Sequence, residues 1–267
     1  MAIGKAQKAK QRRQIITAVI LGVIASAVVG VLGFRAMTKE SFDSRFCPSS
    51  IPGHTVILID KTDKLGFTQQ QALLTDVSAV IKNLKVGTLV SVFALAADFE
   101  STAAPIIQLC SPGRFEVGDS TLTKSKSFTE KQFKERFEAP ILRTIEELAA
   151  TSPDSSSPIL EMLQLVGIKG FKSAGISNNL ELVIYSDFLH NTRNFSMYKA
   201  SNNFNEFIAS AYGMQAMPKL RDVQVHMKYL MHTPKFQGKD NQFFWQRLFK
   251  HSGTVMEKIE TIEGGGL

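Results

Sequence analysis

Two short apolar runs of this chain each end at an aspartate. One run covers residues 55–60 and ends at Asp60, and the other covers residues 182–186 and is followed by Asp187. Hydroxyl side chains flank both aspartates. Carboxylate and hydroxyl oxygens are the ligands that a hard divalent cation such as Mg²⁺ prefers. The residue types therefore indicate a cation site, and the alternative is that each aspartate only caps the loop or helix that follows it.

A run of three serines supplies further hydroxyl groups. Ser155, Ser156 and Ser157 directly precede Pro158, and proline is common in the first turn of a helix. We expect Ser157 to N-cap that helix, because a serine hydroxyl can accept a hydrogen bond from a free amide of the first turn. Ser156 would then remain available as a ligand.

Strand and helix patterns alternate along the chain and must position these side chains. We predict strands at 55–60, 88–95, 106–110, 181–186, 223–230 and 255–262. We predict helices at 68–84 with Thr68 as N-cap, 128–150 with a break near Pro140, 158–166, 203–212 and 241–251. This alternation predicts an α/β domain with a mainly parallel sheet. Because ligands bind at the carboxyl ends of the strands of such sheets, Asp60 and Asp187 are expected to line one site.

With its three polar segments in this order, the chain resembles a von Willebrand factor A (vWA) domain over residues 54–262. That family has a doubly wound α/β fold and a metal-ion-dependent adhesion site, made by an Asp-x-Ser-x-Ser motif, a later Thr and a later Asp. The matching residues here are Asp60, Thr62, Ser156, Ser157 and Asp187. The resemblance implies that they bind Mg²⁺ and leave one position open for a carboxylate of a partner protein. It implies a protein-interaction module rather than an enzyme. We expect this module to belong to a bacterial envelope, transfer or defence complex.

The chain departs from the family motif at Lys64, which replaces the second serine. A lysine ammonium cannot ligate a cation and would repel one, and it could instead pair with Asp60 or Asp63. Ser155 is an alternative for the later hydroxyl position. A second hypothesis is therefore a metal-independent scaffold with a vestigial site.

A third hypothesis is a Mg²⁺-dependent phosphohydrolase, because strand-end aspartates also serve as nucleophile and metal ligand in that chemistry. However, Asp60-Lys61-Thr62 lacks the second aspartate that haloacid-dehalogenase-like phosphatases use.

The N-terminal part of the chain has the pattern of a membrane anchor. Residues 15–34 are uncharged and mostly apolar, and about 20 such residues cross a bilayer. Five basic residues precede them, which places the N-terminus in the cytoplasm and the rest outside the inner membrane, in a bacterial periplasm. A cleaved signal peptide, ending near residues 25–27, is the alternative. Gly22, Ser26 and Gly30 are spaced as in helices that dimerise in membranes.

The expected organisation follows from these patterns. It is a basic tail 1–14, a span 15–34, a stalk 35–53, a domain 54–262 with an insertion around 98–150 near the partner-binding edge, and a disordered tail 263–267.

The positive charge of the chain belongs to its N-terminus. Residues 1–45 hold eight basic and two acidic residues, whereas the rest holds 23 basic and 22 acidic residues. A nearly neutral domain argues against nucleic-acid binding.

The only cysteines are Cys47 and Cys110. Outside the cytoplasm they could form a disulfide, and the alternative is two free buried thiols.

Overall fold

The computed structural model describes residues 16–31, 42–98, 104–115, 125–150, 154–199 and 202–262. The chain divides into two compact units, Met1–Ser41 and Phe42–Leu267. The predicted tails 1–14 and 263–267 lie outside the described residues, as do residue 15 and residues 32–41 of the predicted span and stalk.

The first unit contains a helix over residues 16–31, and the residues of this helix are exposed. The Ser26 hydroxyl donates a hydrogen bond to the Gly22 carbonyl oxygen, at 2.9 Å. Within the described residues, no helix combines the length and the apolar character needed to cross a membrane.

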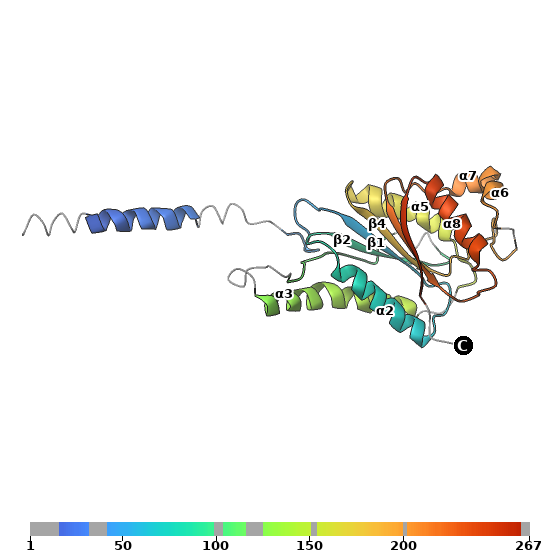
Figure 1. The fold of residues 1–267 in the computed structure, drawn as a ribbon, viewed down its shortest axis with the longest axis horizontal. Coiled ribbons are helices and arrows are strands. Elements are labelled where there is room, and N and C mark those ends of the chain that lie inside the picture. The colour runs from blue at the N-terminus through green and yellow to red at the C-terminus, as the bar shows by residue number, and fades with distance from the viewer. Residues whose placement is uncertain are drawn as a thin grey trace, which may run out of the picture. The chain divides into compact units, whose positions relative to one another are not determined.

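The second unit is built on a sheet of six strands in the order β3–β2–β1–β4–β5–β6 (Figure 1). The strands are β1 (His54–Asp60), β2 (Leu89–Leu95), β3 (Ile107–Cys110), β4 (Leu180–Ser186), β5 (Gln224–Leu230) and β6 (Val255–Ile262). All neighbours are parallel except β3, which is antiparallel to β2. Each predicted strand agrees with an observed one to within one residue at either end. The predicted mainly parallel sheet is confirmed.

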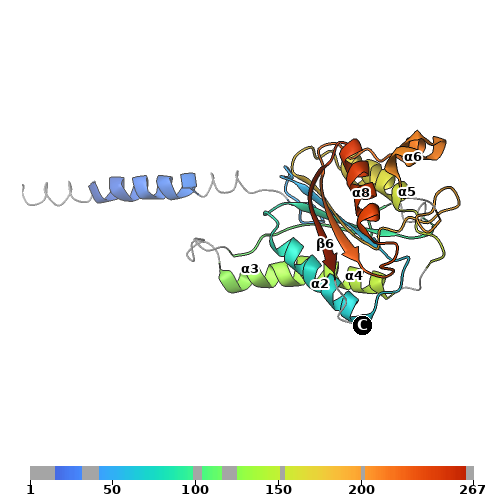
Figure 2. The same cartoon turned by 45° about the vertical axis from the view of Figure 1, so that its right-hand side comes forward.

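Helices cover both faces of this sheet (Figures 1 and 2). One face carries α5 (Ile159–Leu165), its π-helical continuation η2 (Val166–Lys172), α6 (Phe204–Ala209), α7 (Ala211–Ala216) and α8 (Lys239–His251). The other face carries α2 (Phe67–Lys82), α3 (Lys126–Phe133), the π-helical η1 (Lys134–Glu138) and α4 (Ala139–Ala149). Side chains alternate between the faces along β1, so Val56 and Leu58 join the first core, and Ile57 and Ile59 the second.

Three predicted helices differ in detail from the observed ones. The run 126–149 is not broken at Pro140. The proline lacks an amide hydrogen, and the π-helical turn η1 directly before it keeps the run helical. The predicted helix 203–212 is two helices, because Ser210 has an extended backbone and its hydroxyl caps α7 by accepting from Gly213 N. The N-cap of α2 is Gly66, not Thr68.

A disulfide joins Cys47 to Cys110, with 4.9 Å between their Cα atoms. Of the two alternatives left open by the sequence, the structure has the bridge. Cys110 N also donates to the Arg45 carbonyl at 2.9 Å. The segment before β1, predicted to be a stalk, is therefore fixed to the edge strand β3.

The bridge closes a long loop, since its cysteines are 63 residues apart. Closure restricts the unfolded chain, so the double variant Cys47→Ser/Cys110→Ser should lose about 4 kcal/mol of folding free energy. Urea unfolding measures this loss. The same unfolding midpoint for the variant and the oxidised wild type would contradict the expectation.

His54 is a buried histidine in β1 whose Nε2 lies 2.7 Å from Ser91 Oγ. Burial, and then the charge of Arg45, lower its pKa to about 4. The unfolded chain takes up a proton below about pH 6.5, but the folded chain does so only below about 4. Stability therefore falls as pH drops through this window, by about 3 kcal/mol from this residue.

The variant His54→Gln should show a shallower loss of stability between about pH 6.5 and pH 4, because glutamine does not titrate. Urea unfolding at several pH values gives the slope for each protein. Parallel slopes would show that His54 is not the source of the acid sensitivity.

Candidate functional site

Asp60 accepts three hydrogen bonds at the carboxyl end of β1. Its Oδ1 accepts from Thr62 N at 2.9 Å and from Thr62 Oγ1 at 2.6 Å. Its Oδ2 accepts from Ser186 Oγ at 2.6 Å, across to the end of β4. Asp60 is 5% exposed. Its carboxylate thus fastens the loop after β1 to the neighbouring strand.

The sheet topology brings these strand ends together. From β1 the chain moves outward to β2 and β3, and it then returns to β4 on the other side of β1. Ligand sites of open α/β sheets lie where the strand order reverses in this way. Alternation along the strands places Asp60 and Ser186 on the face of Leu58 and Ile184, toward α5 and α8. Sequence reasoning did not count Ser186 as a site residue, although it is the polar residue that ends the apolar strand β4.

Asp187 is 3% exposed, and only one of its two carboxylate oxygens accepts a hydrogen bond. Its Oδ1 accepts from Leu189 N at 2.9 Å, whereas its Oδ2 is buried without a hydrogen-bond partner. Burial raises the pKa of Asp187 well above its usual value, and the charge of Asp60 raises it further. Burial also raises the pKa of Asp60, against the hydrogen bonds from Ser186 and Thr62.

The segment before α5 joins the same site. Asp154 N donates to the Thr62 carbonyl at 2.9 Å, and Asp154 Oδ2 accepts from Ala97 N at 3.0 Å. Ser157 and Asn191 exchange two backbone hydrogen bonds of 2.9 Å each. The loops after β1, before α5 and after β4 therefore meet at one rim of the sheet.

The three serines have different surroundings. Ser155 is exposed, and the Ser156 hydroxyl donates to the Asn191 carbonyl at 3.0 Å. The Ser157 hydroxyl is buried without a partner. It does not cap α5 as predicted. Instead Leu160 N donates to Nδ1 of His190, at 3.4 Å, and burial keeps that ring neutral by lowering its pKa to about 3.

The loop that carries Asp187 is held from α8. Phe188 has a positive φ of 57°, which is rare for a bulky residue. Its carbonyl accepts from Trp245 Nε1 at 2.8 Å and from Asn241 Nδ2 at 2.9 Å. Gln237 Nε2 donates to the Asp187 carbonyl at 3.0 Å. Sequence reasoning missed these supports, because nothing in their spacing shows that α8 begins beside the end of β4.

Lys64 does not neutralise the site. It is exposed, and within the described part of the chain it makes no ion pair with Asp60 or Asp63. Asp63 instead lies 3.7 Å from Nε2 of His232, after β5. The alternative in which Lys64 pairs with one of these carboxylates is therefore wrong. In the same part of the chain, no lysine or arginine pairs with Asp60 or Asp187.

The arrangement could hold a divalent cation through a mixed set of oxygens. Three of these are Thr62 Oγ1, Ser157 Oγ and Asp187 Oδ2. The Asp60 carboxylate accepts a hydrogen bond from Thr62 Oγ1. Two of them, on Ser157 and Asp187, are buried atoms without partners, and hard cations take up such oxygens. Among the described residues no group of three His, Cys, Asp or Glu side chains could hold a metal, so a cation here would depend on hydroxyl ligands.

No family description matches this chain, and no curated protein matches its sequence. Similar solved structures include a von Willebrand factor type A protein from Catenulispora acidiphila, with 11% identity, a TM-score of 0.38, and 78% of this chain and 43% of that chain covered. Another is the ArnB paralog VWA2 from Sulfolobus acidocaldarius, with 11% identity, a TM-score of 0.42, and 84% and 49% covered. A third is a mutant of the PilB minor pilin from Streptococcus sanguinis, with 10% identity, a TM-score of 0.44, and 81% and 58% covered. The chain spans about half the length of these proteins.

The variant Asp187→Asn should stabilise the cation-free protein at about pH 8, by about 1–2 kcal/mol. It removes one of two buried like charges. Because the pKa of Asp187 is raised in the folded state, ionisation of its carboxyl destabilises the folded protein increasingly as pH rises. The stabilisation produced by Asp187→Asn should therefore be smaller at about pH 5. Urea unfolding in EDTA measures both values. The exposed control Glu147→Gln should change neither, and a less stable Asp187→Asn protein at the higher pH would contradict the expectation.

Proposed function

We propose that this chain is a vWA-type protein-interaction module, without enzymatic activity, that binds an acidic side chain of a partner protein through a divalent cation. The observation that carries the proposal is the pair of buried carboxylates, Asp60 and Asp187, with no cationic side chain beside them in the described part of the chain. Buried charges are normally paired or bound to a metal. A cation such as Mg²⁺ would supply the missing positive charge.

The roles of the residues follow from their contacts. Asp187 Oδ2 and Ser157 Oγ are available as ligands, because neither atom has a hydrogen-bond partner in the described part of the chain. Thr62 donates its hydroxyl proton to Asp60, so its oxygen lone pairs are free to face a cation. Asp60 orients Thr62, and Ser186 orients Asp60. Ser156 is the less suitable ligand, since it is bonded to Asn191. The cation, when bound, attracts a carboxylate of the partner to its open position.

Titration of the full chain with Mg²⁺ or Mn²⁺ tests the cation. A ligand that binds only the folded state at about 100 times its Kd stabilises that state by about 2.7 kcal/mol, so we expect the Tm to rise by about 5–10 °C. Asp187→Ala and Thr62→Ala should abolish the rise, and Glu147→Ala should retain it. A cation-independent Tm in the wild type would contradict the proposal and favour the metal-independent scaffold.

The variant Lys64→Ser restores the hydroxyl of the family motif and removes a positive charge near the site. At a few ångströms in water this charge opposes a cation by about 1 kcal/mol or more, so half-saturation should need about fivefold less Mg²⁺. The same titration measures the shift. Lys85→Ser, an exposed lysine before β2, is the matched control. An unchanged half-saturation in Lys64→Ser would mean that Lys64 lies too far away to matter.

The proposal extends to the location of the module. Residues 15–34 would anchor it in the inner membrane, with the N-terminus in the cytoplasm and the domain in the periplasm. The uncharged stretch and the five basic residues before it support this, and a disulfide suits an oxidising compartment. Gly22, Ser26 and Gly30 would let two anchors pair. Protease added to spheroplasts should digest the domain, and full protection would contradict this orientation.

A further inference from the structure

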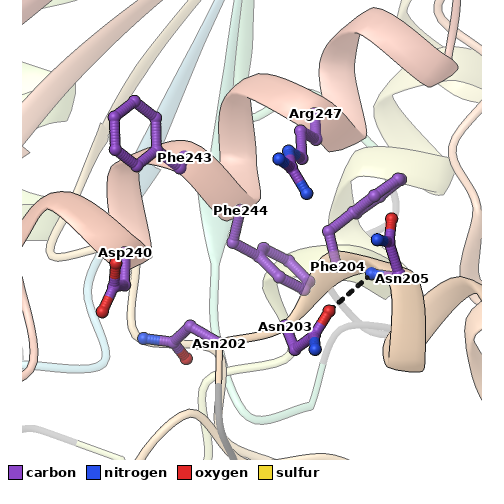
Figure 3. Close-up of a pocket in the computed structure, with 8 residues that line it drawn as sticks. All are labelled: Asn202, Asn203, Phe204, Asn205, Asp240, Phe243, Phe244 and Arg247. Carbon is purple, nitrogen blue, oxygen red and sulfur yellow. Dashed lines mark hydrogen bonds between the residues drawn. The ribbon is translucent and has the colours of Figure 1, made fainter.

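A groove runs along the start of α8, beside the candidate site. It consists of two adjoining pockets of about 370 and 530 Å³, which share Asn202 and Asp240. The first lies between the loop that follows β4 and the loop that follows β5. The second lies between residues 202–205 and the first turns of α8, where Phe244 and Arg247 point toward that segment (Figure 3). We call these two pockets the α8 groove.

The α8 groove is rich in unpaired positive charge. Its cationic residues are Lys199, Lys235, Lys239 and Arg247. All four are exposed, and among the described residues none of them makes an ion pair. Of the described residues that line it, Asp240 alone is acidic. In a domain that is otherwise nearly neutral, this concentration of one sign would attract an anionic ligand.

The groove lies next to the candidate site. Asn241, which lines the first pocket, donates to the Phe188 carbonyl, and the nearby Gln237 donates to the Asp187 carbonyl. Tyr198, which lines the first pocket, packs against the ring of Phe236 at 5.1 Å. Burial, and then the charges of Asp187, Asp63 and Asp60, raise the pKa of Tyr198 to about 12. The first pocket therefore lies close to the carboxylates of the candidate site.

Resting on the proposed function, we propose that the α8 groove binds an acidic segment of the partner, next to the carboxylate that the cation receives. The lysines and Arg247 would then contact successive carboxylates of that segment. Phe243, which is 53% exposed, offers an apolar wall at the far end. The partner is thus recognised by a run of acidic residues, and a single acidic side chain is not sufficient.

An acidic segment fits the surroundings better than another polyanion does. The charges of Asp60, Asp63 and Asp187 act on Tyr198 in the first pocket, and they repel any anion until a cation offsets them. A protein carboxylate can occupy the cation and leave its neighbours in the sequence beside the lysines. The cation and the lysines should therefore contribute together to the same binding event.

The test uses the full chain in a non-ionic detergent and a fluorescein-labelled oligo-aspartate peptide of about six residues, which spans about 20 Å when extended. Fluorescence anisotropy gives its Kd with Mg²⁺ or with EDTA. Lys199→Ala/Lys235→Ala/Lys239→Ala should raise the Kd about tenfold or more. The control Lys85→Ala/Lys126→Ala/Lys131→Ala makes the same charge change on exposed lysines elsewhere, and it should change the Kd less than about twofold.

The EDTA measurement tests the cation-dependent function, and the groove variant with its control tests the α8 groove. If EDTA leaves the Kd unchanged but the groove variant weakens binding, the groove is upheld and the cation-dependent function is overturned. If EDTA weakens binding but the groove and control variants behave alike, the groove proposal is overturned and the function is upheld. An oligothymidylate that binds more tightly than the peptide and needs the same lysines would also overturn it, in favour of a nucleic-acid site.

Discussion

The Asp60 carboxylate accepts one hydrogen bond from Ser186 and two from Thr62, and the remaining site depends on this arrangement. It fixes the loop after β1 against the end of β4, at the point where the strand order reverses. Asp187 is then placed one residue beyond Ser186, inside the protein and near a second carboxylate. Neither acid has a cationic side chain beside it in the described part of the chain, although burial disfavours both charges. The fold thus holds two buried carboxyl groups in a place where a cation would stabilise their ionised forms.

Support for this arrangement comes from outside the site. The positive φ of Phe188 turns the chain immediately after Asp187, and Trp245 and Asn241 of α8 bond its carbonyl. The same helix forms one wall of the α8 groove. A ligand that moves α8 would therefore act on the backbone that carries Asp187. This physical connection is why recognition of a partner in the groove and occupation of the site by a cation are expected to depend on each other.

Much of the fold could be predicted from the sequence, because apolar runs and helical periodicity report local burial directly. The sheet strands agreed to within a residue. The site was harder to predict. The convergence of three loops followed from the rule that ligands bind at strand ends, and the loops that carry Asp60, Thr62, Ser157 and Asp187 meet at one rim of the sheet. The hydrogen bonds of the individual hydroxyl groups could not be predicted from this rule. His190, for example, caps α5 in place of Ser157. Contacts from α8 are non-local and leave no signal in spacing. The exposure of Lys64, which pairs with neither Asp60 nor Asp63 in the described part of the chain, likewise depends on a loop conformation that residue types do not fix.

The central claim is that the oxygens of Thr62, Ser157 and Asp187 surround one cation. A crystal structure of the protein grown with Mn²⁺ tests it most directly, because anomalous scattering identifies that metal and gives its position. The account predicts one anomalous peak at about 2.2 Å from oxygens of these residues, with Asp60 behind Thr62. A structure in which Mn²⁺ binds elsewhere, or in which the Lys64 ammonium occupies the space between Asp60 and Asp187, would contradict it.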